Sequence, residues 1–207
     1  MPNPWLDIPL ADYEGHMASP EVRQLEALSE LFAEALELRR PGSIVILGVA
    51  GGNGLDRIDS KVTERVVGVD INPLYLKTVR QRYSHLRGLV LHCADLAEET
   101  LHLPPVELVY AALVFEHAGT GRCLDNALRL VSEGGALSIV VQLPSAIEQN
   151  VGKSGFTSLE RLQSHFKLVD PDELRALLQK RGYSAVHETR RSLPAGKAFW
   201  MGVFAHG

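Results

Sequence analysis

The sequence predicts an α/β fold built on a mostly parallel sheet. Five short apolar runs alternate with segments of helical pattern, which is the order of elements in a parallel sheet with crossover helices. A glycine-rich turn follows the first of these runs. Two further strand-like runs follow near the C-terminus. The turn between them is so short that they are expected to form an antiparallel hairpin. The chain of 207 residues is long enough for one buried core and too short for two large domains, so we expect a single domain over residues 1–207.

Composition and charge exclude several classes of protein. Hydrophobic residues make up 45% of the chain and charged residues 22%, which is typical of a globular domain. The net charge of −4 disfavours a nucleic-acid partner, because domains that bind nucleic acid are usually basic. The sequence has neither an apolar run that would cross a bilayer nor a signal peptide at its start. We therefore expect a cytoplasmic protein without a membrane partner, either a monomer or a homodimer.

Residues 1–42 are expected to form an N-terminal arm and a helix. The stretch up to Ala18 contains three prolines and is predicted to be irregular. Ser19 and Pro20 have the residue types of an N-cap and a first helical position, so a helix is predicted from Pro20. Apolar residues then recur at spacings of three and four, until basic residues and a Pro-Gly pair end the helix near Arg40.

Residues 43–143 are expected to form the central part of the sheet. The apolar runs predicted to be strands are 43–49, 65–70, 88–95, 106–112 and 136–143. Helices are predicted from about residue 55, from Pro73 after the N-cap Asn72, and over 122–131. Parallel strands connected in this way cross over in the right-handed sense, which leaves few topologies.

The remainder is predicted to form a small lid and the end of the sheet. Residues 144–169 make up the lid, with a short helix that a capping box opens at Thr157. Residues 170–207 begin with a helix after Asp170 that stops at Gly182. The strands of the terminal hairpin follow at 183–193 and 197–205.

Glycines and acidic residues stand where the first three strands are predicted to end. Ligands of an open α/β sheet bind outside the carboxyl ends of its strands. A glycine-rich turn exposes backbone amides to a ligand, and the carboxylate of Asp70 is placed to accept hydrogen bonds from ribose hydroxyls. Asp95, after the third strand, can accept from an exocyclic amine such as adenine N6. Each feature also has a purely structural interpretation, as a tight turn, a helix cap or a solvated carboxylate.

The chain resembles the class I S-adenosylmethionine-dependent methyltransferases, a Rossmann-like family with a seven-stranded sheet. The matching segments are 44–54, 66–72, 93–96, 113–117 and 130–135. The resemblance implies a three-layer sandwich whose last two strands are the terminal hairpin. It also implies S-adenosylmethionine as cofactor and S-adenosylhomocysteine as product. The residues that it assigns to the cofactor are Gly48, Ala50, Gly51, Gly52, Asn53, Gly54, Asp70, Ile71, Asp95, Leu96 and Leu113.

Two positions depart from the pattern of the family. The family usually has an acid in place of Gly48 and a glycine in place of Ala50. The acid normally helps to hold the amino acid end of the cofactor, so its absence implies a different contact or weaker binding. Ala50 is a mild change if its φ angle is negative. These departures motivate an alternative function, that of a cofactor-binding or orphan protein that has this fold and transfers no methyl group.

An NAD(P)-binding oxidoreductase is a second alternative. Its fingerprint is G-x-G-x-x-G. The third glycine is missing when the pattern is started at Gly52, and the second and third are missing when it is started at Gly48. The C-terminal hairpin also favours the methyltransferase.

The resemblance also identifies candidate residues for the reaction. The sulfonium is an activated methyl donor, so the protein mainly has to align the acceptor, and a general base is needed only for a protonated acceptor. Glu116 and His117 follow the fourth strand, and His117 is the candidate base because the pKa of histidine lies near neutrality. A histidine that only orients a loop is the alternative. Tyr13, His16 and His165 are candidates for contacts with the acceptor, and ordinary surface positions are the alternative for them.

The acceptor is predicted to be a small molecule, without help from a metal. The eight histidines have no spacing typical of metal ligands, and Cys93 and Cys123 are expected to be reduced core thiols. Ala111 and Ala112 stand where the metal-dependent branch of the family has an acid. The same segment also lacks the prolines of the enzymes that methylate nucleic acid amines. The small lid suits a small acceptor better than a protein.

Overall fold

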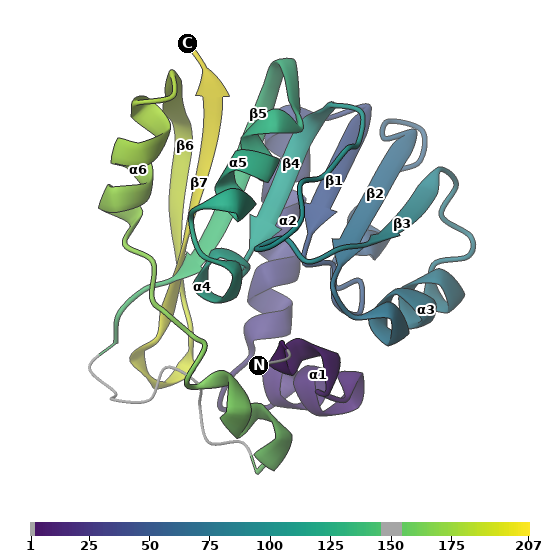
Figure 1. The fold of residues 1–207 in the computed structure, drawn as a ribbon, viewed down its shortest axis with the longest axis vertical. Helices are drawn as coiled ribbons and strands as arrows, with labels where there is room; N and C mark the ends of the chain where they lie inside the picture. Colours follow the sequence, from purple (N-terminus) through teal and green to yellow (C-terminus); the bar gives the residue numbers. More distant parts are fainter. Residues whose placement is uncertain (1–2, 146–154) are drawn as a thin grey trace.

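The computed structural model describes residues 3–145 and 155–207 (Figure 1). Seven strands form one sheet in the order β3-β2-β1-β4-β5-β7-β6. Strands β1 to β5 run parallel, and β7 pairs antiparallel with both β5 and β6. The predicted sheet is therefore confirmed. The strands are β1 (Ser43–Leu47), β2 (Arg65–Asp70), β3 (Leu89–Cys93), β4 (Val106–Ala112), β5 (Val131–Gln142), β6 (Tyr183–Ser192) and β7 (Ala198–His206).

Helices cover both faces of the sheet, as Figure 1 shows for α2 behind it and for α5 and α6 in front. The α-helices are α1 (Leu10–Ala18), α2 (Gln24–Arg39), α3 (Pro73–Arg82), α4 (Phe115–Ala118), α5 (Arg122–Arg129) and α6 (Pro171–Gln179). Short 3-10 helices are η1 (Pro4–Leu6), η2 (Leu55–Arg57), η3 (Thr157–Leu162) and η4 (Pro194–Gly196). This is the three-layer sandwich that the resemblance implied.

Two hydrophobic cores separate the layers. In β1, Ile44 and Ile46 belong to the core that contains α2, whereas Val45 and Leu47 belong to the core that contains α5 and α6. Successive side chains of a strand point to opposite faces, so a central strand must be apolar at every position. This double burial explains why the central strands were recognisable as continuous apolar runs.

Residues 3–24 fold differently from the prediction. Residues 10–18 form α1, and Ser19 is its C-cap, because the Ser19 N–H donates to the His16 carbonyl at 3.1 Å. α2 begins at Gln24 rather than at Pro20, after Arg23 adopts a left-handed conformation with φ 47°. Ser19 and Pro20 therefore lie in the turn between two helices. One helix was predicted after an irregular stretch up to Ala18, whereas the structure has two helices here, so both the irregular stretch and the helix start at Pro20 were wrong.

Other differences are local. β5 begins at Val131, because an irregular pairing near Val106 extends it beyond the predicted start at residue 136. The lid contains a 3-10 helix that ends at Leu162, and part of the predicted lid, residues 146–154, lies outside the described residues. Both cysteines are free; Cys123 is buried as expected, whereas Cys93 is exposed and not a core thiol. In the part of the chain that the structure describes, every helix is too short or too polar to cross a membrane.

Asn126 attaches α5 to the loop that follows β3 and carries Asp95. Its side chain is 1% exposed. The Asn126 amide oxygen accepts from the Leu101 N–H at 2.9 Å, and its amide nitrogen donates to the Glu99 carbonyl at 2.8 Å. One buried amide thus satisfies two backbone groups of an otherwise irregular loop.

We expect Asn126→Ala to lower the free energy of unfolding by about 2–3 kcal/mol, because it leaves buried backbone groups without partners. The melting temperature should fall by about 4–12 °C for a chain of this size, as measured by circular dichroism. Asn126→Asp keeps an acceptor for Leu101 but places a buried carboxylate against the Glu99 carbonyl, so it should also lower the free energy of unfolding. Equal stability of Asn126→Ala and the wild type would contradict this role.

Candidate functional site

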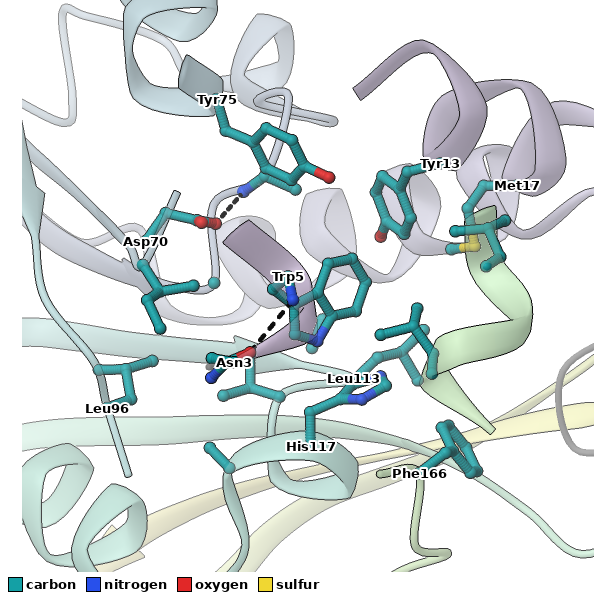
Figure 2. Close-up of a pocket in the computed structure, with 18 of the residues that line it drawn as sticks. Asn3, Trp5, Tyr13, Met17, Asp70, Tyr75, Leu96, Leu113, His117 and Phe166 are labelled. Carbon is teal, nitrogen blue, oxygen red and sulfur yellow. Dashed lines mark hydrogen bonds between the residues drawn. The ribbon is translucent and has the colours of Figure 1, made fainter. Parts of the chain in front are cut away.

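A pocket lies at the carboxyl ends of β1, β2 and β4, beneath the N-terminal arm (Figure 2). It brings together residues that are far apart in the sequence. The predicted site residues that line it are Tyr13, His16, Gly48, Ala50, Asp70, Ile71, Asp95, Leu96, Leu113 and His117. The predicted residues Gly51, Gly52, Asn53, Gly54, Glu116 and His165 do not line it.

The Asp70 carboxylate connects the two loops at the floor of the pocket. One oxygen accepts from the Ala50 N–H at 2.8 Å and the other from the Asn72 N–H at 2.9 Å. Burial raises the pKa of Asp70, while these backbone donors act in the opposite direction. A carboxylate oxygen can accept more than one hydrogen bond, so Asp70 retains acceptor capacity toward the pocket.

Backbone geometry restricts which residues can stand at positions 48 and 50. Gly48 has φ +71°, and a Cβ built there would lie 2.5 Å from Cγ2 of Val114. An acid at this position would therefore be strained and would displace Val114. Ala50 has φ 45°. Because a residue with a side chain is disfavoured in the left-handed region, Ala50 is not the mild change that a negative φ would have made it.

The rest of the glycine-rich turn supports the arm. A Cβ at Gly51 would overlap the Glu14 carboxylate, which forms an ion pair with Arg82. The Asn53 side chain donates to the Leu25 carbonyl at 2.9 Å. Residues 51–54 thus let α1 and α2 approach the sheet closely, and they do not line the pocket.

The arm and η3 together form the roof of the pocket. The Asn72 side chain donates to the Trp5 carbonyl at 2.8 Å, and the Tyr75 hydroxyl donates to the Ile8 carbonyl at 2.9 Å. The Ser158 hydroxyl donates to Asp12 Oδ2 at 2.6 Å. The roof has a small hydrophobic core of its own, formed by Ile8, Leu159 and Leu162.

His117 lies beneath this roof between two aromatic rings. Its ring centroid is 4.9 Å from that of Trp5 and 5.3 Å from that of Phe166, both edge-on. Figure 2 shows the Trp5 and His117 rings side by side. Burial, with a smaller effect of His165, lowers the pKa of His117 to about 4. His117 is therefore neutral at physiological pH, and the expectation of a pKa near neutrality does not hold.

Glu116 is the neighbour of His117 in sequence but lies behind the pocket wall. Its side chain is 1% exposed, and Oε1 accepts from the Gln142 N–H at 2.8 Å. The Glu116 carbonyl accepts from the Lys167 N–H at 2.9 Å. Burial raises the pKa of Glu116 to about 7. Glu116 thus holds α4 against the end of β5 and the segment after η3.

The other candidates divide between the pocket and the surface. Asp95 lines the pocket and also caps the following turn, since Oδ1 accepts from the Ala97 N–H at 2.9 Å. Tyr13 packs edge-on against Trp5 at 5.5 Å, and burial raises its pKa. His16 is buried, and both burial and Lys197 lower its pKa. His165 is exposed, so the structure places it on the surface rather than against an acceptor.

Sequence reasoning missed several residues that line the pocket. They are Asn3, Trp5, Met17, Gln24, Gln142 and Phe166. The large apolar side chains of the arm, among them Trp5 and Met17, were an available signal, because such side chains are usually buried against another part of the protein. Within residues 3–145 and 155–207, no three His, Cys, Asp or Glu side chains gather in a group that could hold a metal ion.

Comparison with known proteins finds a methyltransferase domain in the central part of the chain. Residues 45–139 match a family model described as a methyltransferase domain, and these residues contain the glycine-rich turn, Asp70, Asp95 and His117. This match and the fold support the resemblance to the class I S-adenosylmethionine-dependent methyltransferases. A search of curated proteins found no significant match.

Solved structures share the fold of this methyltransferase. The N-methyltransferase NodS from Bradyrhizobium japonicum WM9, in complex with S-adenosyl-L-homocysteine, has a TM-score of 0.67 and 15% identity over 98% of this chain and 97% of its own. The magnesium protoporphyrin IX methyltransferase ChlM from Synechocystis PCC 6803, with the same product bound, gives 0.64 and 14% over 87% and 83%. The [4+2]-cyclase SpnF gives 0.68 and 12% over 89% and 82%. At these identities the likeness shows the fold alone.

The short distance between position 48 and Val114 predicts that substitutions at these two positions have coupled effects on stability. Gly48→Ala should lower the free energy of unfolding by about 2–5 kcal/mol, from the left-handed backbone and from overpacking against Val114. In the double variant, Gly48→Ala with Val114→Ala, the free energy of unfolding should fall by less than the sum of the two single effects. The difference should be at least about 1 kcal/mol. Urea denaturation of the four proteins measures this coupling, and strict additivity would exclude the contact.

The raised pKa of Glu116 predicts that the free energy of unfolding depends on pH. Its pKa is about 7 in the folded protein and 4.5 ordinarily. The unfolded chain therefore releases this proton first, and stability falls as pH rises from about 4.5 to about 7. Glu116→Gln should be as stable as the wild type near pH 4.5 and more stable by up to about 3 kcal/mol above pH 7.

The difference between the two proteins isolates Glu116, because His117, with its lowered pKa, has the opposite pH dependence. Urea denaturation at several pH values measures it. The exposed Glu133 provides the control variant Glu133→Gln. A constant difference between Glu116→Gln and the wild type across this range would contradict the assignment.

Proposed function

We propose that this methyltransferase transfers a methyl group from S-adenosylmethionine to a small-molecule acceptor bound beneath the roof. The observation that carries the proposal is one pocket in which acids from two strand ends, Asp70 and Asp95, share the lining with the half-buried His117. The names of two similar structures, NodS and ChlM, describe enzymes of the same reaction class and support it.

The hydrogen-bond acceptors on the floor of the pocket fit the nucleoside part of the cofactor. Asp70 would accept from ribose hydroxyls with the capacity left by its two backbone donors. Asp95 would accept from the adenine amine, and the apolar side chains of Ile71, Leu96 and Leu113 would contact flat or aliphatic parts of the ligand. The backbone at Gly48 and Ala50 would lie near the amino acid end.

The residues of this chain mainly position the reactants and exclude water. When bound, S-adenosylmethionine supplies the methyl group as an electrophile. The roof formed by the arm and η3 covers the pocket, which separates the reacting groups from solvent. A pKa of about 4 makes His117 a weak base, so we assign it the orientation of the acceptor by a hydrogen bond rather than the removal of a proton before attack.

One specific observation favours the alternative of a protein that binds the cofactor without methyl transfer. Both departures from the family pattern, Gly48 and Ala50, occupy left-handed backbone at the floor of the pocket. SpnF, whose name describes a cyclase, has a similar fold. In this alternative S-adenosylhomocysteine binds and the protein methylates no acceptor.

Asp70 provides the test of cofactor binding. We expect Asp70→Asn to raise the dissociation constant of S-adenosylhomocysteine at least tenfold in isothermal titration calorimetry, because a hydrogen bond to a charged group is lost. Asp95→Asn keeps an oxygen for the Ala97 N–H and should weaken binding without unfolding the loop. Asp56→Asn, at an exposed position beside the glycine-rich turn, should leave binding unchanged.

Thermal unfolding then distinguishes the functional alternatives. S-adenosylhomocysteine at about 100 times its dissociation constant should raise the melting temperature by about 5–10 °C, whereas NAD should have no effect. A shift with NAD alone would overturn the proposal. Binding of S-adenosylmethionine and S-adenosylhomocysteine, without methylation of any acceptor in a broad mass-spectrometric panel, would favour a protein that binds the cofactor without methyl transfer.

A further inference from the structure

The part of the pocket around His117 differs chemically from the floor. The rings of Trp5 and Phe166 contact His117 edge-on, and the same pocket is lined by the aromatic and aliphatic side chains of Tyr13, Met17, Leu159 and Leu162. Asp70 lies on the other side of the Trp5 ring from His117 in the view of Figure 2. A ligand here would be surrounded by rings that make favourable edge and face contacts with another ring.

One polar atom in this enclosure has no partner. Nδ1 of His117 is buried and makes no hydrogen bond to any residue that the structure describes. A buried polar atom without a partner is costly, and such atoms in native proteins usually mark a bound molecule or a functional group. The atom therefore indicates where a hydrogen-bonding group of a ligand belongs.

The charges of the residues that line the pocket restrict the charge of the acceptor. Among the described residues that line the pocket, none is Lys or Arg, and the only carboxylates are Asp70 and Asp95 on the floor. The polar side chains nearer the roof include Gln24 and Gln142, whose amides lie 3.5 Å apart and carry no charge. An anionic acceptor would be buried without a counterion, and a cationic one would lack a carboxylate beside His117.

Resting on the proposed function, we infer that the acceptor is an uncharged aromatic molecule whose hydroxyl group donates a hydrogen bond to Nδ1 of His117. The ring would lie among the aromatic residues of the roof, and the hydroxyl oxygen would be the methylated atom. Its bond to the methyl carbon forms as the carbon–sulfur bond breaks, the electron pair of that bond stays on sulfur, and the hydroxyl proton passes through His117 to solvent.

Four matched probes test this inference: 4-fluorophenol, 4-fluorotoluene, 4-fluorobenzoate and 4-fluorobenzylamine. Ligand-observed fluorine NMR in the presence of S-adenosylhomocysteine measures their binding. We expect 4-fluorophenol to bind at least tenfold more tightly than each of the others. His117→Phe, which keeps a ring and removes the nitrogen, should abolish the preference over 4-fluorotoluene. His102→Phe, at an exposed position outside the pocket, should leave it unchanged.

The outcomes separate this inference from the proposed function. Preferred binding of the benzoate or the benzylamine would overturn the inference. An unchanged preference in His117→Phe, or no binding of 4-fluorophenol at about 10 millimolar, would overturn it as well. Titration of the same samples with S-adenosylhomocysteine tests the cofactor site independently. If that ligand binds while the phenol does not, the acceptor class is wrong and the methyltransferase proposal stands.

Discussion

The buried carboxylate of Asp70 determines how the loops around the pocket are arranged. It accepts an N–H from Ala50 in the glycine-rich turn and another from Asn72 at the start of α3. Asn72 in turn caps α3 and donates to the Trp5 carbonyl of the roof. A single acid at the end of β2 therefore connects the floor, a helix N-terminus and the cover. Such an acid is tolerated in the interior because backbone donors replace the water that it has lost.

Local patterns were sufficient to predict the sheet, but they were ambiguous at helix ends. Asn72 and Asp170 each precede a proline, and each begins a helix as predicted, with side-chain oxygens that accept backbone N–H groups. Ser19 also precedes a proline, yet it ends a helix. The residue types of a cap and of a turn between two helices are the same, so only the packing of α1 and α2 on the core decides between them.

The floor of the pocket was predictable in more detail than the roof, for which the sequence indicated Tyr13 and His16 but neither Trp5 nor Phe166. Glycine and acid positions follow from strand ends, which the apolar runs reveal. The environment of His117 depends on Trp5 and Phe166, which tertiary folding brings to it. Burial also has opposite effects on adjacent residues, because it disfavours the charged form of both: the pKa of Glu116 rises and that of His117 falls. The φ angle of Ala50 was likewise invisible in the sequence.

The roof also has a consequence for the order in which the chain folds. Its contacts join positions far apart in the sequence: Trp5 reaches Asn72 across 67 residues, and Asp12 reaches Ser158 across 146. Closing such long loops costs chain entropy before any contact repays it, so contacts of this range form late. We therefore expect the sheet to assemble first with its ligand-facing edge uncovered. A cofactor present during folding would meet an open floor, and the cover would close over it as the last step.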